Sequence, residues 1–279
     1  MPSVDTREVG LEIGATVFKY FLNTEYLHYG YFSDGLAVTP QNLATAQVRY
    51  ADLLIASIPA GTRRILDVGC GTGRFALDLL NHGYAVDCVS PGTILTGHAR
   101  RLLGSRSHIF PCKFEDLVTD RRYDLVLFSE SFQYIDPAGA LAGAQRVLDP
   151  GGHILICDIF KVDPGRQSKL GGGHDLDPYL RTVAQQPLTL VREQDITAET
   201  AGTIDLANRL SLEVLRPTYD LILRMVDDRY PRLARLLRWK YRKKLARVEA
   251  RHFSGERTGE NFIRYKKYML YLYATGHRS

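Results

Sequence analysis

A strand-like apolar run that closes on an acidic residue and three alternating glycines constrains this chain more than any other stretch. Residues 65–74 read I-L-D-V-G-C-G-T-G-R. A backbone that turns from a strand into a helix, and approaches a ligand closely, needs residues that lack a Cβ and can adopt positive φ. The stretch therefore predicts a buried strand, a nucleoside-binding turn and a helix, in that order.

The spacing of these glycines separates two classes of cofactor. Dinucleotide-binding turns follow G-x-G-x-x-G, and from Gly69 that register would need a glycine at Arg74, so the pattern fails. The chain instead has D-x-G-x-G-x-G, which resembles the first motif of the class I S-adenosylmethionine-dependent methyltransferases. A glycine-rich turn in another doubly wound protein is the alternative. The resemblance implies that S-adenosyl-L-methionine is the cofactor and that five residues of the motif contact it: Asp67, Gly69, Cys70, Gly71 and Gly73.

Strand and helix patterns alternate from about residue 40 to residue 195. This predicts an α/β fold with a doubly wound, Rossmann-like, mostly parallel sheet of seven strands. The order resembles the methyltransferase sheet, which implies that the last strand is antiparallel. We expect the strands at 63–69, 84–90, 108–112, 123–129, 153–159, 188–192 and 265–276.

Two helical segments are expected beside this core. Residues 41–195 and 261–279 would form the cofactor-binding core, and residues 1–40 a helical N-terminal lid segment. Residues 196–260 have helical periodicity and would form a basic insertion, with Pro217 and Pro231 near helix starts. Because ligands bind beyond the carboxyl ends of the strands in such sheets, both segments are expected to cover the substrate.

Composition narrows the class of protein. The 279 residues are 45% hydrophobic and 24% charged, have no apolar run of membrane-spanning length, and start without a basic-then-apolar signal, so we expect a cytoplasmic protein. The four cysteines include no C-x-x-C pair, which argues against a zinc site or a disulfide framework. His174, Asp175 and Asp177 form a short local set without a distant partner, so we expect no metal.

The positive charge of the chain is concentrated in one segment. The formal net charge is +5, and residues 229–251 contain ten Lys or Arg against the single acid Glu249. Such a segment can meet an acidic substrate, an anionic membrane surface or nucleic acid, and it can also be a solvated helix face. No zinc finger, RNA-binding signature or base-flipping tetrad accompanies it, and the fourth strand ends in S-E-S-F, so nucleic acid is disfavoured.

Further positions of the methyltransferase pattern can be matched along the sheet. Ser90 stands at the end of the second strand, where the family usually places an acid that holds the cofactor ribose, and a small hydroxyl residue there is similar to the cyclopropane-fatty-acid-synthase-like branch. Asp87 is an alternative, although strand alternation points it the other way. In C-K-F-E-D-L (112–117), Lys113 replaces the acid that meets adenine. Phe114 would supply a backbone amide and an apolar wall, and Glu115 or Asp116 would replace the acid or merely cap a short helix.

Three further segments of the sequence complete the resemblance. Ser129, Gln133 and Tyr134, in YDLVLFSESFQYI (123–135), would line the methionine end of the cofactor and the substrate pocket, and LDPGGHILICDI (148–159) is similar to the region of the fifth strand. Cyclopropane synthases carry a Glu-His pair where this chain has Gln-Tyr. The segment L-H-Y-G-Y-F (27–32) resembles the H-Y-G-Y-W motif of small-molecule and lipid methyltransferases, which implies that Tyr29 and Tyr31 close over the cofactor. A buried aromatic helix end is the alternative.

Methyl transfer from a sulfonium depends on in-line positioning and exclusion of water, and it needs a base only when the acceptor arrives protonated. His174, which follows three glycines, is the first candidate base, His28 the second and Tyr134 the third. A solvent-facing loop histidine is the alternative for His174.

Taken together, the residues and the resemblance predict a methyltransferase that acts on O, N or C of a small, largely apolar metabolite in secondary metabolism. The runner-up is a lipid or isoprenoid C-methyltransferase that works near an anionic membrane surface through residues 229–251. A cyclase that binds the cofactor without transferring methyl is less favoured, and so is a nucleic-acid methyltransferase. The sequence does not predict an oligomeric state.

Overall fold

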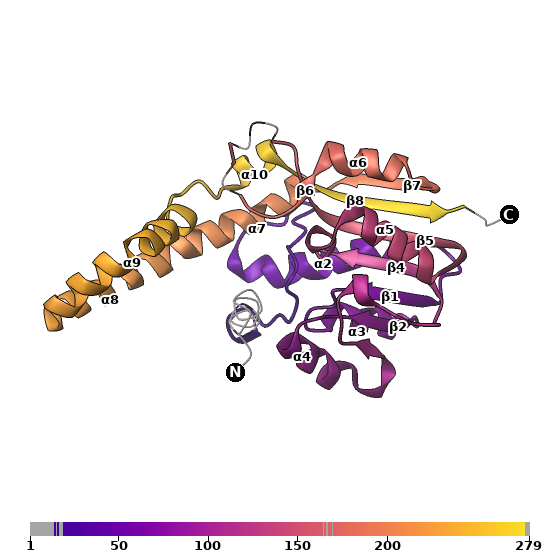
Figure 1. Cartoon of the computed structure of the whole chain (residues 1–279), viewed down its shortest axis with the longest axis horizontal. Helices are drawn as coiled ribbons and strands as arrows, with labels where there is room; N and C mark the ends of the chain where they lie inside the picture. The colour runs from indigo at the N-terminus through magenta and orange to yellow at the C-terminus, as the bar shows by residue number, and fades with distance from the viewer. Residues whose placement is uncertain are drawn as a thin grey trace.

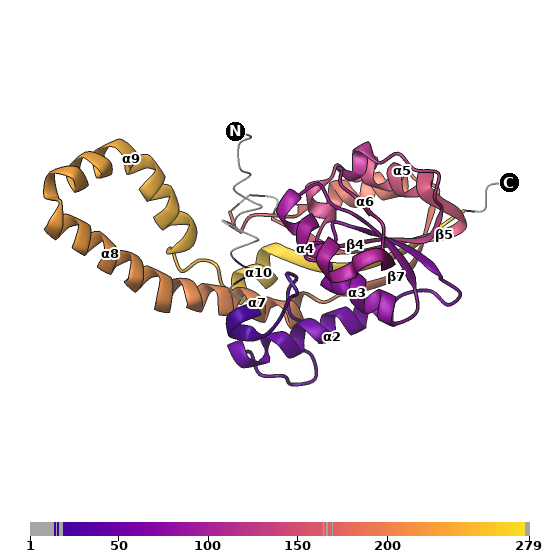
Figure 2. The ribbon, with the colours of Figure 1, turned by 90° about the horizontal axis from the view of Figure 1, so that it is seen from below.

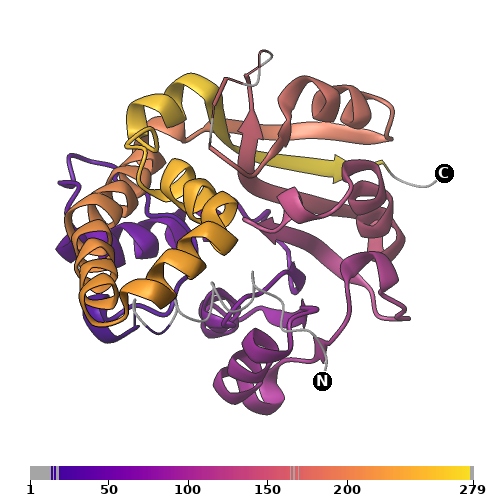
Figure 3. The same cartoon turned by 60° about the vertical axis from the view of Figure 1, so that its left-hand side comes forward.

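A mostly parallel sheet forms the centre of the computed structural model, which describes Gly14, Thr16 and residues 19–276 except 164, 166 and 169. The strand order is β3-β2-β1-β4-β5-β8-β7, with β6 beside β5. Strand β8, yellow in Figure 3, is antiparallel to both of its neighbours, as predicted for the last strand. The strands are β1 (Arg64–Val68), β2 (Ala85–Val89), β3 (Ile109–Phe110), β4 (Tyr123–Ser129), β5 (Leu148–Lys161), β6 (His174–Asp175), β7 (Leu188–Asp195) and β8 (Lys266–Thr275). The predicted fold class is therefore confirmed, although the sheet has an eighth short strand, β6, that was not predicted.

Helices cover both faces of the sheet, so the central strands are apolar on both sides (Figures 1 and 2). In β1, Ile65 packs into one core with α2, α3, α4 and α7, whereas Leu66 and Val68 pack into a second core with α5 and α6. These helices are α2 (Leu43–Ile55), α3 (Arg74–Asn81), α4 (Thr93–Leu103), α5 (Pro137–Val147), α6 (Leu176–Ala184) and α7 (Thr197–Arg209), with short 3-10 turns η1 (Pro40–Asn42), η2 (Gly104–Arg106), η3 (Phe114–Asp116) and η4 (Phe132–Tyr134).

The expected helical insertion forms a projection from the sheet. Helix α7 continues through a π-helix, η5 (Leu210–Leu215), into α8 (Arg216–Arg229), and α9 (Pro231–His252) runs back toward α10 (Gly259–Tyr265). Pro217 lies in the first turn of α8 and Pro231 begins α9, as predicted. Because proline has no N–H to continue an α-helical ladder, a π-helix just before it lets the chain stay helical. Figure 2 shows α8 and α9 extending away from the sheet.

The N-terminal segment agrees with its prediction only in part. Gly14, Thr16 and residues 19–22 are helical, whereas residues 23–38 contain no helix, although a helical lid was expected over residues 1–40. Residues 1–13, 15, 17 and 18 lie outside the described part of the chain. From Thr24 to Phe32 buried and half-buried residues alternate, as in an extended chain. We call residues 24–32 the strap.

Of the helices that the structure describes, none combines the length and apolar character needed to cross a bilayer.

Candidate functional site

The glycine turn after β1 has the geometry that its sequence predicts. Gly69, Gly71 and Gly73 have φ values of 82°, 56° and 83°. A Cβ on Gly69 would lie 2.5 Å from the Cβ of Ser131, and one on Gly73 would lie 3.0 Å from Ala99. The Gly73 N–H donates to the carbonyl of Cys70 at 2.9 Å and α3 begins at the next residue. A side chain at Gly69 or Gly73 would therefore collide with a neighbour, and the positive φ of all three residues favours glycine.

Asp67 lies at the end of β1 beside this turn, with 2% of its surface exposed. Its Oδ2 atom has no hydrogen-bond partner among the described residues. Burial raises the pKa of Asp67 from 3.8 to about 7. A buried carboxyl oxygen without a partner is costly, so this atom fits a ligand that brings an ammonium group or another donor to the turn.

The strap crosses the turn and is fastened by its main chain. The Tyr29 N–H donates to Oε1 of Glu130 at 2.6 Å, beyond the end of β4. The Gly30 N–H donates to Thr203 Oγ1 at 3.0 Å in α7, and Thr72 Oγ1 in the glycine turn donates to the Glu25 carbonyl at 2.8 Å. These bonds bring the aromatic segment to the glycine turn and to the end of β4.

His28 lies inside the strap as a neutral imidazole. Its ring stacks on Tyr50 with 4.3 Å between ring centroids, and Nδ1 donates to the Tyr29 carbonyl at 2.8 Å. Burial lowers the pKa of His28 to about 4. Nε2 has no partner among the described residues, so its lone pair can accept a hydrogen bond from a ligand.

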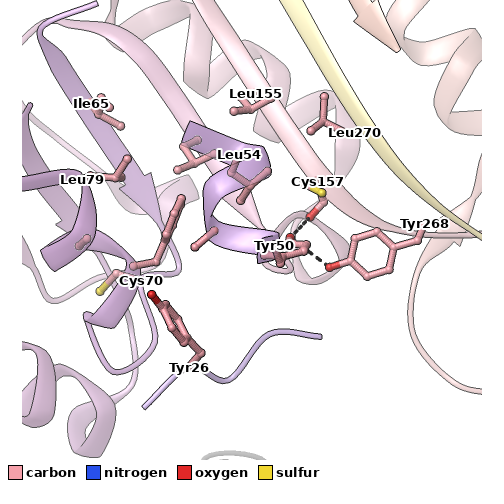
Figure 4. Close-up of a cluster of buried hydrophobic side chains, with 14 of the residues drawn as sticks. Tyr26, Tyr50, Leu54, Ile65, Cys70, Leu79, Leu155, Cys157, Tyr268 and Leu270 are labelled. Atoms are coloured by element: carbon pink, nitrogen blue, oxygen red, sulfur yellow. Dashed lines mark hydrogen bonds between the residues drawn. The ribbon is translucent and has the colours of Figure 1, made fainter. Parts of the chain in front are cut away.

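Tyr29 of the strap, Tyr50 of α2 and Tyr268 near the start of β8 form a tyrosine cluster, and Figure 4 shows Tyr50 and Tyr268 side by side. The Tyr268 hydroxyl donates to Glu130 Oε1 at 2.6 Å and lies 3.1 Å from the Tyr50 hydroxyl. The Tyr50 hydroxyl in turn lies 3.2 Å from Oγ of Ser129, one of the predicted cofactor-binding residues. Tyr29 packs at 5.6 Å from the Tyr268 ring, so these aromatic rings enclose the Glu130 carboxyl.

Two acids at this edge of the sheet were missed by the sequence reasoning. Glu130 is half-buried as a residue, yet burial of its carboxyl raises its pKa to about 8, and nearby Asp158 contributes. Asp158 is fully buried at 0% exposure, and its pKa is raised by burial to about 7. The signal was present, because each acid interrupts or closes an otherwise apolar strand run, L-V-L-F-S-E and I-L-I-C-D-I.

Gln133 links Asp158 to the chain after β5. Its N–H and Nε2 both donate to Asp158 at 3.0 Å, and its Oε1 accepts the Gly173 N–H at 3.1 Å. Gln133 was predicted to line the methionine end of the cofactor, and the structure places it between two neighbouring strand ends. Its amide is engaged on both sides, which fixes its orientation.

The ends of β2 and β3 carry the predicted ribose and adenine positions. Ser90 is buried after β2, and its N–H donates to the Phe110 carbonyl at 3.1 Å. Asp87 points away, as strand alternation predicts, and accepts bonds from Arg121 and Tyr123, each at 2.8 Å. The position of Ser90 therefore remains the one that faces the carboxyl edge of the sheet.

The Phe114 ring is buried in the core beneath α5, with 5.4 Å between its centroid and that of Phe128. Its side chain is therefore committed to packing. Glu115 and Asp116 are exposed in the first turn of η3, and neither forms the side-chain cap that was the alternative for them.

Of the other candidate bases, His174 lies on β6, where Nε2 is 3.1 Å from the Phe132 carbonyl. Tyr134 is 66% exposed. Tyr31 is half-buried in the strap, and its N–H donates to the Ala46 carbonyl at 2.8 Å. The structure thus gathers Asp67, the three glycines, Ser129, Tyr29 and His28 around the ends of β1 and β4, with His174 and Tyr134 beside β5 and β6.

Part of the chain is similar in sequence to known methyltransferases. Residues 66–156 match the methyltransferase domain family. The chain is 31% identical over 143 residues to an uncharacterised methyltransferase of Mycobacterium bovis, which covers 50% of this chain and 59% of that protein. It is 30% identical over 142 residues to an O-methyltransferase of Aspergillus sclerotiorum, covering 48% and 53%. The chain therefore spans less than two thirds of the length of these relatives.

Solved structures share the fold along nearly the whole chain. A [4+2]-cyclase, SpnF, has a TM-score of 0.67 at 18% identity and covers 98% of both chains. The geranyl diphosphate C-methyltransferase of Streptomyces coelicolor A3(2) has a TM-score of 0.66 at 16% identity, and the cyclopropane synthase MmaA2 of Mycobacterium tuberculosis 0.68 at 16%. Each covers 98% of this chain and 99% of its own. The structural matches confirm the predicted fold, and residues 66–156 are similar to the methyltransferase domain family.

Proposed function

We propose that this chain transfers a methyl group from S-adenosyl-L-methionine to O, N or C of a small, largely apolar acceptor in secondary metabolism. The observation that carries the proposal is Asp67, a buried carboxyl with an unpartnered oxygen beside the glycine turn. It lies in the segment that matches the methyltransferase domain family. The α-ammonium of the cofactor supplies the charge and the donors that this oxygen lacks.

The cofactor would be held by residues from successive strand ends. The turn from Gly69 to Gly73, including Cys70, allows its close approach to the main chain. Ser90 would bind the ribose hydroxyls, and the Phe114 backbone with Glu115 would meet the adenine. Tyr29 and Tyr31 of the strap would close over it. Ser129 and Gln133 would stand at its methionine end.

When bound, the cofactor supplies an electrophilic methyl group on a sulfonium. The chain would orient the acceptor and exclude water, for which the tyrosine cluster and the main-chain bonds of the strap are suited. Apolar rings line this region, which supports an apolar acceptor. Neither role requires a protein nucleophile.

For an acceptor that arrives protonated, we propose Glu130 as the proton acceptor. Its pKa of about 8 lies near neutral pH, where a general base is most effective. His174, His28 and Tyr134, the candidates from sequence, are less well supported. Nε2 of His174 faces a carbonyl, Tyr134 is mostly exposed, and the pKa of His28 near 4 makes it a hydrogen-bond acceptor and a weak base.

The test is incubation of the purified chain with methyl-labelled cofactor and fractionated extract of the source organism, followed by mass analysis of labelled products. We expect one fraction to yield a labelled small molecule together with S-adenosylhomocysteine, and Asp67→Asn to lose this product at limiting cofactor. Cofactor binding by calorimetry without S-adenosylhomocysteine from any fraction would contradict methyl transfer. That result would favour a cyclase that binds the cofactor without transferring methyl, and the chain shares its fold with a [4+2]-cyclase.

A lipid or isoprenoid C-methyltransferase is the second candidate. It is favoured by fold similarity to a geranyl diphosphate C-methyltransferase and a cyclopropane synthase, by the serine at position 90, and by the basic segment 229–251. Methyl transfer to isoprenoid diphosphates or to lipids in anionic vesicles, weakened by salt, would support it. Turnover of a soluble acceptor that is insensitive to salt would exclude it.

A further inference from the structure

The helical hairpin of α8 and α9, residues 216–252, is an arm that projects from the sheet (Figures 1 and 2). Large apolar side chains are exposed on both of its helices. Leu221 and Met225 of α8 are 63% and 61% exposed, and Trp239 of α9 is 68% exposed. Contiguous exposed apolar residues on a folded protein indicate a surface that another component covers. The other exposed apolar side chains of the arm are Ile222, Tyr230, Leu233, Leu236, Leu237 and Tyr241.

One face of α9 combines apolar and basic residues. Leu236 and Trp239 are three residues apart, and Arg232, Arg235 and Lys243 lie at spacings of three or four from them, so all five share a side of the helix. All five are exposed. This face can therefore present an indole and a leucine between three cationic side chains.

The opposite side of α9 is the less exposed one. Ala234, which is buried, and Leu245, which is half-buried, are the least exposed side chains described on α9, and their spacing of eleven residues places both on one side. The Arg238 guanidinium pairs with Asp227 of α8, which ties the two helices together. The face with Trp239 is thus presented outward by a hairpin whose helices contact each other.

The charge of α9 identifies the kind of component that covers it. Residues 231–252 contain nine Lys or Arg and one acid, Glu249. A second copy of the arm would bring two such helices together and would add like-charge repulsion. A nucleic-acid backbone would satisfy the charge but would leave Leu236 and Trp239 without an apolar environment. An anionic bilayer surface offers phosphate groups to the cations and an acyl boundary to the indole and leucine.

We infer that the arm docks on an anionic membrane surface, with Leu236 and Trp239 entering the headgroup and acyl boundary and Arg232, Arg235 and Lys243 contacting lipid phosphates. This inference goes beyond the proposed methyl transfer, because it concerns a surface outside the cofactor site. It is tested without cofactor or acceptor, so its failure and the failure of the proposed function are separate results.

The chain contains one tryptophan, Trp239, so its fluorescence reports on the arm alone. The full-length protein is titrated with vesicles of phosphatidylcholine and phosphatidylglycerol in equal parts, and with vesicles of phosphatidylcholine alone. We expect a blue shift of the emission with the anionic vesicles, and quenching when their acyl chains are brominated. An emission spectrum that the anionic vesicles leave unchanged would overturn the inference.

Charge variants test the same surface by vesicle cosedimentation. The triple variant Arg232→Gln, Arg235→Gln and Lys243→Gln removes three cations, which lowers the partition coefficient on the order of 100-fold. The matched control removes three exposed cations outside the arm, within residues 41–195: Arg101→Gln, Arg122→Gln and Arg181→Gln. We expect the control to bind nearly as well as the original protein. Equal losses in both triple variants would overturn the assignment to the arm.

Two other occupants give distinct results. A dimer in vesicle-free solution, whose Trp239 emission is already blue-shifted and moves to the red on dilution, would show that a second copy covers the arm. An emission shift with RNA that exceeds the shift with anionic vesicles would show a nucleic-acid surface. Either result would overturn membrane docking. The variant Leu236→Ser is expected to weaken vesicle binding and to leave the circular dichroism of the protein unchanged, since this leucine is 56% exposed.

Discussion

Replacing Asp67 by asparagine is expected to move cofactor affinity and protein stability in opposite directions. The amide has the shape of the carboxylate but not its charge, so a charge-assisted hydrogen bond to the cofactor ammonium is lost. Such bonds contribute about 1.5–3 kcal/mol, which corresponds to a rise of about 10- to 100-fold in the dissociation constant. If Asp67 had only a structural role, its replacement would lower both the cofactor affinity and the stability of the protein.

The stability effect follows from the raised pKa of Asp67, about 7 in the folded protein against an ordinary 3.8. Below pH 3.8 the Asp67 carboxyl is protonated in both the folded and the unfolded protein, so it does not lower the free energy of unfolding. Between pH 3.8 and 7 only the unfolded state releases the proton, so stability falls as pH rises, and above pH 7 the full cost remains. At about 1.4 kcal/mol per pKa unit this cost is on the order of 4 kcal/mol. Asp67→Asn removes this cost, but burying the asparagine amide without hydrogen-bond partners offsets about 1–3 kcal/mol of the stability that is gained.

Asp67→Asn should therefore stabilise the cofactor-free protein by about 1–3 kcal/mol at pH 8 and should not stabilise it at pH 4. Urea unfolding at both pH values measures the free energy, and calorimetry with S-adenosylmethionine measures the affinity. Asp87→Asn is the matched control on β2, because Asp87 is held by Arg121 and Tyr123. The control is expected to lose stability and to keep its affinity. Unchanged cofactor affinity in Asp67→Asn, or lower stability at pH 8, would refute the assignment of this residue.

Three further outcomes are expected. Gly69→Ala should cost about 3 kcal/mol of unfolding free energy, because its Cβ would lie 2.5 Å from that of Ser131. Gly71→Ala, whose nearest neighbour is at 3.7 Å, should cost about 1 kcal/mol, and equal losses by urea unfolding would contradict this. Glu130→Gln should lower kcat about 100-fold or more with an acceptor that must lose a proton, while His174→Gln should change kcat less than about tenfold. A larger loss of kcat in His174→Gln than in Glu130→Gln, measured by steady-state kinetics, would assign the base to His174. Since the pKa of Glu130 is raised to about 8 in the cofactor-free protein, kcat/KM for the cofactor should rise with pH up to about 8 and then level off, and a flat profile would argue against proton transfer to this residue.

The sheet could be predicted from sequence because buried parallel strands appear as continuous apolar runs between glycine, proline and charged residues. The prediction for 123–129 coincides with β4 (Tyr123–Ser129). Boundaries were less accurate where pairing decides them. Strand β3 was expected over 108–112 and pairs only at Ile109–Phe110, whereas β5 continues from Leu148 to Lys161 because β4, β6 and β8 all pair with it.

The strap could not be predicted because its aromatic residues have spacings that also suit a helix. Its extended form is set by partners far away in sequence, such as Thr203 for Gly30 and Glu130 for Tyr29. The glycine turn was predictable because its conformation is local. The apolar run around Asp158 marks it as a buried acid, but its role depends on partners that lie far away in sequence, such as Gln133.

Asp67 lies near the end of β1, Glu130 directly follows β4 and Asp158 lies within β5, and these three strands are neighbours in the sheet. Burial raises the pKa of each acid, to about 7, 8 and 7, so ionising these carboxyls at neutral pH is unfavourable when no cation is bound beside them. A ligand with an ammonium and a sulfonium would relieve this cost, whereas the product of methyl transfer has a neutral sulfur in place of the sulfonium. Acids that stabilise the positive sulfur therefore favour the methyl donor over the product. The same charge that would bind the cofactor would then help to release S-adenosylhomocysteine after each transfer, and this edge would remain destabilised until the next cofactor binds.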